Sequence, residues 1–86
     1  MQVLTVTSTG VIVPNQGVQF RGISLTHTAP AACVVKDGAG AFEVGRATIG
    51  DASGGADGFM LPGPVPCIGL NITAITAGVV LQVYVE

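Results

Sequence analysis

Histidine is the side chain best suited to acid–base chemistry at neutral pH, and His27 is the only histidine in the chain. Ser24 and Thr26 lie close to it in sequence, so two hydroxyl groups are candidates for a nucleophile that a histidine activates. Such a nucleophile also needs an acidic residue to orient the imidazole, and none is near His27 in sequence. We therefore interpret His27 as a strand-end residue that faces solvent or a partner, and we expect no enzymatic activity.

The oxygen-rich segment 51–58 is a second candidate for chemistry, because Asp51, Ser53 and Asp57 alternate there with glycine and alanine. The segment resembles a calcium-binding loop, but it lacks the terminal glutamate and occurs once rather than in stacked copies. A flexible loop of small residues has the same composition, and we favour that interpretation. We expect no metal and no cofactor. The acidic residues lie mostly in expected turns or at the terminus, without a spacing that suggests catalysis: Asp37, Glu43, Asp51, Asp57 and Glu86.

The two cysteines, Cys33 and Cys67, are sufficient for one disulfide. Such a bridge would stabilise the fold by about 3–4 kcal/mol. The first residues lack the features of a secretory signal, and cysteines in proteins without one are more often buried free thiols. We favour free thiols, although the sequence leaves the pairing open. One histidine and two separated cysteines cannot supply the four ligands of a structural zinc site.

Composition limits the remaining functions. The 86 residues are enough for one domain, which we expect to span 1–86. Only 9% of the residues are charged and 49% are hydrophobic, a combination that excludes intrinsic disorder. Three basic residues and a net charge of −2 argue against binding to nucleic acid or to an anionic membrane. No apolar stretch reaches the roughly 20 residues of a transmembrane helix. A small domain with so few charges is typical of a protein that assembles with other chains.

The hydrophobic pattern indicates strands rather than helices, because apolar residues alternate and glycine or proline recurs about every ten residues. The clearest strand is 79–85, whose alternate residues are valine or leucine. The segment 66–73 alternates in the same way, and the short turn between the two predicts a hairpin. In this pattern Ile68 lies on the core face, and Cys67 points away from the core unless a bulge intervenes.

Two longer strands, expected over 18–28 and 41–49, change the parity of their apolar residues at Gly22 and Gly45. A glycine at such a change indicates a bulge or a bend. Two bent strands favour strands that cross from one sheet to the other in a small sandwich or barrel. Turns are expected at 14–17 and at 37–40, and a rigid kink at 62–64.

These elements predict an all-β fold, a small antiparallel β-sandwich or jelly-roll-like barrel of about seven short strands. The expected strands lie at 10–13, 18–28, around 33–35, 41–49, 59–61, 66–73 and 79–85.

One short apolar segment stands between a glycine-rich and a proline-rich stretch: Phe59, Met60 and Leu61. It is either an edge strand that closes the core or a surface that contacts a partner, because exposed apolar patches and the residue types Phe and Met are typical of interfaces. We carry the three residues forward as candidate partner contacts.

Nearly the whole chain resembles small accessory virion proteins of tailed bacteriophages, of the capsid decoration or cement type. The resemblance is carried by weak motifs, namely 20–26 (FRGISLT), the central Asp-Gly turn, 61–65 (LPGPV) and 78–86 (GVVLQVYVE). It implies a β-sandwich or jelly-roll unit that binds between major capsid subunits, on the capsid exterior of a virion assembled in the host cytoplasm. It also implies self-association as a homotrimer or homodimer. The alternatives are a tail or neck component, or a β-sandwich that binds a receptor or carbohydrate.

Overall fold

The computed structural model describes residues 1–14, 16–38 and 42–86, and these residues are organised as strands joined by short connections. The strands are β1 (Gln2–Val6), β2 (Gly10–Val13), β3 (Val18–His27), β4 (Ala31–Asp37), β5 (Phe42–Ile49), β6 (Gly55–Cys67), β7 (Leu70–Ile75) and β8 (Val80–Val85).

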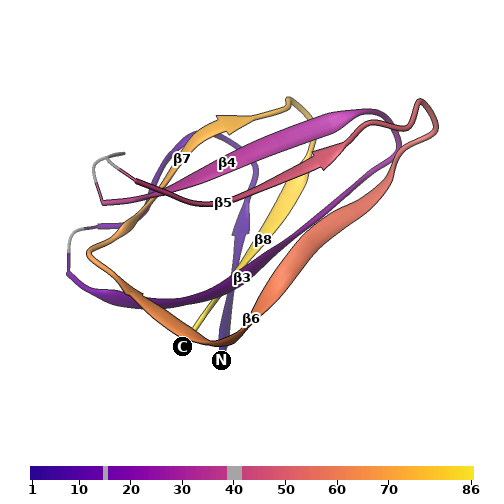
Figure 1. The fold of residues 1–86 in the computed structure, drawn as a ribbon. Coiled ribbons are helices and arrows are strands. Elements are labelled where there is room, and N and C mark those ends of the chain that lie inside the picture. The colour runs from indigo at the N-terminus through magenta and orange to yellow at the C-terminus, as the bar shows by residue number, and fades with distance from the viewer. Residues whose placement is uncertain (15, 39–41) are drawn as a thin grey trace.

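The eight strands form two four-stranded antiparallel sheets that pack face to face (Figure 1). Sheet A has the order β1-β8-β3-β6 and sheet B the order β2-β7-β4-β5. This is the strand order of a jelly roll, in which two Greek keys share one core. The predicted all-β sandwich is confirmed, although the two sheets do not close into a barrel. The strand that the sequence analysis did not include is β1, whose alternation is interrupted by threonine.

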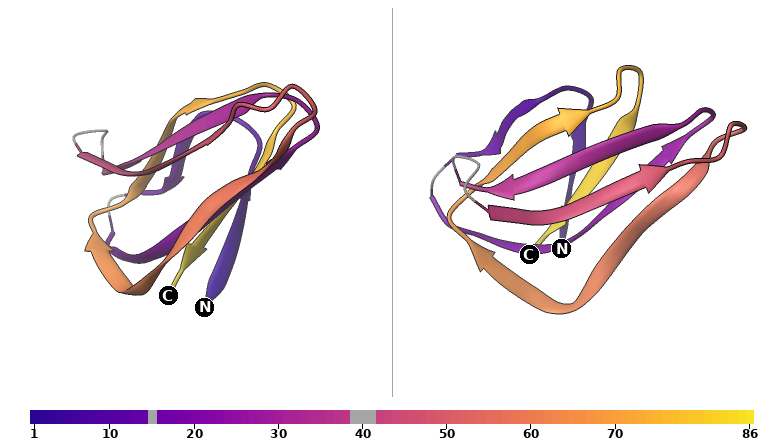
Figure 2. Two further views of the ribbon diagram at one scale, coloured as in Figure 1. Left: turned by 45° about the vertical axis from the view of Figure 1, so that its right-hand side comes forward. Right: turned by 45° about the horizontal axis from the view of Figure 1, so that its top comes forward.

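The chain is arranged as one long hairpin rolled into two layers. β1 pairs with β8, β2 with β7, β3 with β6 and β4 with β5, so that partners lie at similar distances from the middle of the chain. Among the described strands, β4 and β5 are the only sequence neighbours in the same sheet, and every other connection crosses between the sheets. The two ends of the chain therefore lie side by side (Figure 2).

The predicted hairpin between 66–73 and 79–85 is wrong, because β7 belongs to sheet B and β8 to sheet A. Both strands place alternate apolar residues in the same core, but from opposite sides of it. Alternation shows that a strand has a buried face, and it does not show which sheet carries the strand. The predicted hairpin at 37–40 is confirmed by the pairing of β4 with β5, while residues 39–41 lie outside the described residues, as does Asn15 in the expected turn 14–17.

The predicted orientation of Cys67 is also wrong. Cys67 ends β6 and is 6% exposed, packed with the core. The expected continuous strand is broken at residues 68–69, and β7 begins only at Leu70. The break resets the alternation, so that Ile68, expected in the core, is 62% exposed.

Bends occur at both predicted glycines. The pairing of β3 with both its neighbours shifts between Phe20 and Gly22, and the pairing of β4 with β5 shifts where Gly45 lies opposite Val35. The further expectation that these strands cross between sheets is wrong, since β3 stays in sheet A and β5 in sheet B. A bulge adds one residue to a strand, so that the side chains beyond it point to the opposite face from the one that the alternation predicts. The parity change is therefore explained without a change of sheet.

The core between the sheets is made of apolar side chains. The alternate residues of 79–85 lie in it as predicted, together with large residues of β3 and β7 that are at most 1% exposed: Phe20, Ile23, Leu25, Leu70 and Ile72. Among the described residues, no polar or charged side chain is fully buried. The described part of the chain contains no helix of the length and apolar character needed to cross a membrane.

β6 is sharply bent, as the ribbon in Figure 2 shows. In its pairing with β3, Val65 lies opposite Phe20, and the next paired residue is Met60, opposite Gly22. Residues 61–64 therefore have no paired residue in β3 and form the bend. The kink predicted at 62–64 is thus confirmed, within a strand rather than after one. The bend places the segment before it, which contains Phe59, beside the open side of the sandwich between β5 and β6.

Candidate functional site

The outer face of sheet A, which is turned away from sheet B, carries an apolar row across all four strands. Val3 of β1 lies opposite Tyr84 of β8, Tyr84 opposite Gly22 of β3, and Gly22 opposite Met60 of β6. Val3 is 48% and Met60 47% exposed. A Cβ atom on Gly22 would lie 2.9 Å from the Met60 sulfur, so the methionine side chain rests over the glycine. The same Cβ would lie 2.1 Å from the backbone oxygen of Phe59, and this close approach of the β6 backbone is what requires glycine at position 22.

Two further rows on the outer face of sheet A are uncharged. A second row, with partners paired in the same way, consists of Thr5, Gln82, Ser24 and Gly58, and a third of Val80, Thr26 and Ala56. The Tyr84 hydroxyl donates a hydrogen bond to Oε1 of Gln82 at 3.1 Å. This bond holds the tyrosine close to the sheet. The three rows together present apolar and neutral polar groups without a charge.

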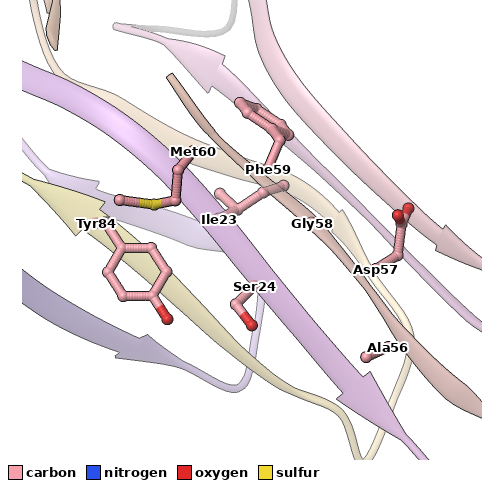
Figure 3. A pocket seen from close by; sticks show the side chains of 8 residues that line it. All are labelled: Ile23, Ser24, Ala56, Asp57, Gly58, Phe59, Met60 and Tyr84. Atoms are coloured by element: carbon pink, nitrogen blue, oxygen red, sulfur yellow. The ribbon is translucent and has the colours of Figure 1, made fainter. Parts of the chain in front are cut away.

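A shallow depression of about 660 Å³ lies on this face beside the apolar row. Figure 3 shows Met60 and Tyr84 together on one side of β3, with Ser24 and Ala56 further along, while Phe59 and Asp57 point away from them. The depression is open to solvent and is lined mainly by apolar atoms. Its shape suits a broad contact with another surface more than the enclosure of a small molecule.

The three residues proposed as partner contacts point in different directions. Phe59 and Leu61 are half-buried and pack against the core, and the Phe59 ring meets that of Phe20 edge to face with centroids 6.1 Å apart. Met60 alone points outward. A Cβ atom on Gly45 would lie 2.6 Å from the Phe59 ring, so this glycine of β5 makes room for the ring. Phe59 closes the open side of the core, and Met60 contributes to the outer face of sheet A.

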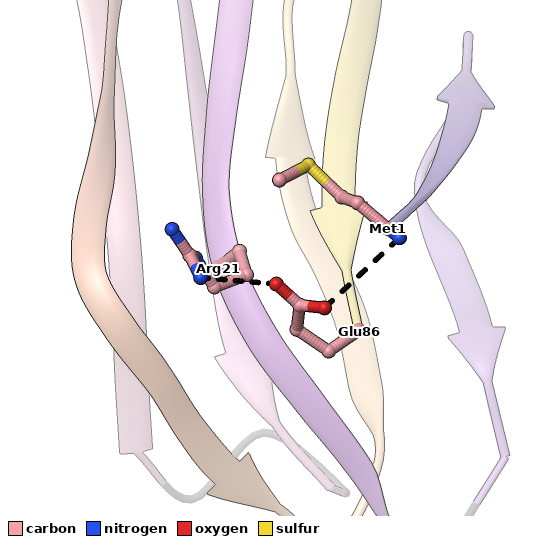
Figure 4. Close-up of polar contacts among 3 residues, drawn as sticks. All are labelled: Met1, Arg21 and Glu86. Carbon is pink, nitrogen blue, oxygen red and sulfur yellow. Dashed lines mark hydrogen bonds and ion pairs between the residues drawn. The ribbon is translucent and has the colours of Figure 1, made fainter.

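Charged groups lie at one end of this face. Arg21 Nη1 donates to Oε1 of Glu86 at 3.0 Å, and the amino group of Met1 lies 4.0 Å from Oε2 of the same carboxylate (Figure 4). These ion pairs are partly exposed, so their contribution to stability is small. They lie at the end of sheet A, beyond the three rows, which carry no charge.

The outer face of sheet B is different, because it carries Lys36, Glu43 and Arg46. Arg46 donates two hydrogen bonds to the Glu43 carboxylate, at 2.6 and 3.0 Å. The hydrogen bonds from the Arg46 guanidinium lower the pKa of the Glu43 carboxyl, and the same bonds raise the pKa of Arg46. This face therefore has the charged character of a surface in contact with water, in contrast to that of sheet A.

The residues considered for catalysis or metal binding are not brought together. His27 ends β3 and is half-buried. No three histidine, cysteine or acidic side chains that could bind a metal lie together in residues 1–14, 16–38 and 42–86. The expected loop 51–58 is a loop only in its first part, since β6 begins at Gly55.

Four acidic side chains accept hydrogen bonds from other residues of the fold. Asp37 accepts from the backbone N–H groups of residues 68 and 69 at 2.8 and 3.3 Å. Asp57 accepts from the N–H of Thr48 at 2.8 Å and links β6 to β5. Asp51 accepts from the N–H and hydroxyl of Ser53, which lowers the pKa of that carboxyl, and Glu43 is held by Arg46 as described. Each of these carboxylates has a structural role.

Both cysteines are free thiols, as favoured from the sequence. Burial raises the pKa of the Cys33 thiol and that of the Cys67 thiol above the ordinary value. A thiol with a raised pKa forms little thiolate at neutral pH, and it is therefore a poor nucleophile.

In comparisons with models of protein families, curated proteins and solved structures, no match to this chain was found. The choice of the outer face of sheet A as the candidate site therefore rests on the structure alone. Sequence reasoning found Met60 but missed Val3 and Tyr84. The valine, leucine and threonine of residues 2–6 are typical of a strand and were a signal for the one that holds Val3. No local feature of the sequence showed that four strands meet in one row.

Proposed function

We propose that the protein is a non-enzymatic structural component of a virion, which decorates or cements a capsid by binding between major capsid subunits. The observation that carries this proposal is the contrast between the two outer faces. That of sheet A is uncharged over three rows of side chains, whereas that of sheet B carries Lys36, Glu43 and Arg46. Depletion of charge is what distinguishes the centre of a protein interface from the rest of a surface.

Exposed apolar side chains occur on both sheets, since Val11 and Phe42 of sheet B are 63% and 73% exposed, so the orientation rests on the difference in charge. Val3, Met60 and Val80 lie on the outer face of sheet A and are each 47–48% exposed. We place this face against the capsid shell and the charged face of sheet B toward solvent. Attachment at many equivalent positions allows each contact to be weak, because avidity multiplies their effect. The jelly-roll strand order is compatible with this role, but lectins and cupins share it, so the fold alone does not decide between functions.

The proposal is tested by mixing the purified protein with expanded capsid shells that lack a decoration protein. We expect saturable co-sedimentation and a higher melting temperature of the shell. Met60→Lys and Val80→Lys, on the outer face of sheet A, should each weaken binding at least about tenfold, equivalent to about 1.4 kcal/mol. Phe42→Lys is the matched control, because Phe42 is 73% exposed on β5 of sheet B, at the edge of that sheet farthest from β2. Equal loss with all three variants, or no co-sedimentation, would refute the proposal.

A second candidate function is that of a receptor- or carbohydrate-binding module, which is favoured by the depression beside Tyr84. Sugars stack on aromatic rings and hydrogen-bond to hydroxyl groups, and Tyr84 and Ser24 supply both at this place. A glycan array distinguishes the two functions. Binding to glycans that is lost in Tyr84→Ala, without binding to shells, would favour this second function over decoration.

A further inference from the structure

A sandwich of two four-stranded sheets has four edge strands, and three of them are protected against pairing with another chain. β6 contains Pro62, Pro64 and Pro66 and is bent, and β5 carries charged residues and is linked to β6 through Asp57. β2 has only four residues, its register shifts between residues 11 and 13, and a proline follows it. Prolines, charges, bends and shortness are the features that keep edge strands from associating.

β1 lacks the prolines, charges and bends, and with five residues it is one residue longer than β2. It reads Gln2-Val3-Leu4-Thr5-Val6, without charge, proline or glycine, and pairs with β8 at all five positions without a register shift. Among the described residues, its backbone has no hydrogen-bond partner besides those in β8. The groups on its other side are thus available to a further strand. A straight, uncharged edge with Val3 half-exposed is an open template for strand addition.

The surroundings of β1 extend this apolar edge. Leu4 is half-buried, and between it and Ile12 of β2 lies an opening of about 300 Å³ at the side of the sandwich. Val11, on the neighbouring edge strand, is 63% exposed. Apolar groups of both sheets therefore gather on the same side of the molecule, and a partner that pairs with β1 would cover them as well.

A second copy of the chain is the partner that fits this edge. Two identical strands that pair antiparallel are related by a twofold axis, so each supplies what the other needs. Because β1 has no charge, the strands do not repel each other. The nearest charged side chains, Arg21 and Glu86, lie at the end of β1 where Gln2 pairs with Val85. In an antiparallel pair these ends lie far apart, whereas a parallel pair would bring like charges together.

We propose that the protein forms a twofold dimer by antiparallel pairing of β1 with β1 of a second copy, which joins the two A sheets into one eight-stranded sheet. The dimer does not depend on the proposed function, since it is a property of the isolated chain. The interface is small, because it consists of five paired residues and the apolar side chains around them. We therefore expect a weak dimer whose fraction rises with protein concentration.

Sedimentation velocity on the isolated protein, from about 1 µM to about 1 mM, tests this inference over the range of weak affinities. We expect dimers to increase with concentration. The double variant Val3→Lys/Thr5→Lys should raise the dissociation constant at least about tenfold, as should Val3→Glu/Thr5→Glu. An equimolar mixture of the lysine and glutamate variants should dimerise again, because opposite charges then meet across the axis. Val80→Lys is the matched control, equally exposed but on the internal strand β8, and should dimerise like the wild type.

Amide hydrogen exchange on the wild-type protein provides a test that does not need folded variants. We expect the amides of residues 2–6 that do not pair with β8 to gain protection as the protein concentration rises. A wild-type chain that stays monomeric over the whole range would overturn the inference. So would a dimer in which exchange in β1 is independent of concentration, or one that Val80→Lys disrupts as strongly as the charged β1 variants do.

Discussion

The packing of Phe59 against Gly45 gives a quantitative prediction about the open side of the core. In Gly45→Ala the added Cβ would lie 2.6 Å from Cζ and 3.0 Å from Cε1 of Phe59. Carbon atoms pack at about 3.5–4.0 Å, so the ring would have to move by roughly 1 Å. It cannot move freely toward the core, because Phe20 already meets it edge to face.

The expected magnitude has two parts. Overpacking costs about 1–3 kcal/mol, and replacing glycine by alanine within a strand returns about 0.5–1 kcal/mol of conformational entropy. Gly45 does not have a positive φ, so the backbone tolerates alanine. Gly45→Ala should therefore destabilise the fold by about 1–2 kcal/mol. In a domain of this size, 1 kcal/mol lowers the melting temperature by about 4–8 °C.

A double-mutant cycle separates this clash from other causes. Phe59→Leu removes the ring atoms that collide and costs on the order of 1–2 kcal/mol by itself, since the edge-to-face contact with Phe20 is lost. In that background Gly45→Ala should be neutral or stabilising by up to about 1 kcal/mol. The free energies are measured by urea denaturation at one protein concentration, followed by circular dichroism. An equal cost of Gly45→Ala in both backgrounds would show that Phe59 is not the reason for the glycine.

Three further predictions concern the polar and thiol groups. Asp37→Ala should lower the free energy of unfolding by about 1–2 kcal/mol in urea denaturation, because two backbone N–H groups lose their acceptor, while Asp37→Asn, which keeps an oxygen, should cost clearly less. Cys33 and Cys67 should react with a thiol reagent slowly in the native state and rapidly in urea, and added reductant should leave the melting temperature unchanged; rapid native labelling would contradict their burial. Both thiol pKa values are higher in the folded than in the unfolded chain, where they are near 9. The folded chain therefore holds these protons more tightly, and its free energy of unfolding should decline as pH rises above about 9. Replacing both cysteines by alanine should flatten this alkaline decline in thermal melts, and an unchanged slope would refute the linkage.

The alternation of apolar residues determined much about this protein by itself. It fixed the fold class and the buried face of 79–85, because a strand with one wet face must alternate with period two. Glycine at a change of parity predicted the bulges at Gly22 and Gly45, since a bulge is the local way to exchange faces. Asp-Gly at 37–38 predicted the hairpin of β4 and β5, because turn chemistry is local.

What only the tertiary structure decided is which strands are neighbours. β7 and β8 have the pattern of a hairpin and lie in opposite sheets, because each buries its apolar face equally well from either side of one core. The apolar row of Val3, Tyr84, Gly22 and Met60 likewise joins residues from both ends and the middle of the chain. Its existence depends on strand order and register, which are set by packing between distant segments and not by any local preference. The low charge of the sequence predicted assembly, which stays a prediction, and the fold determined which face is uncharged and which edge strand is without proline, charge or bend.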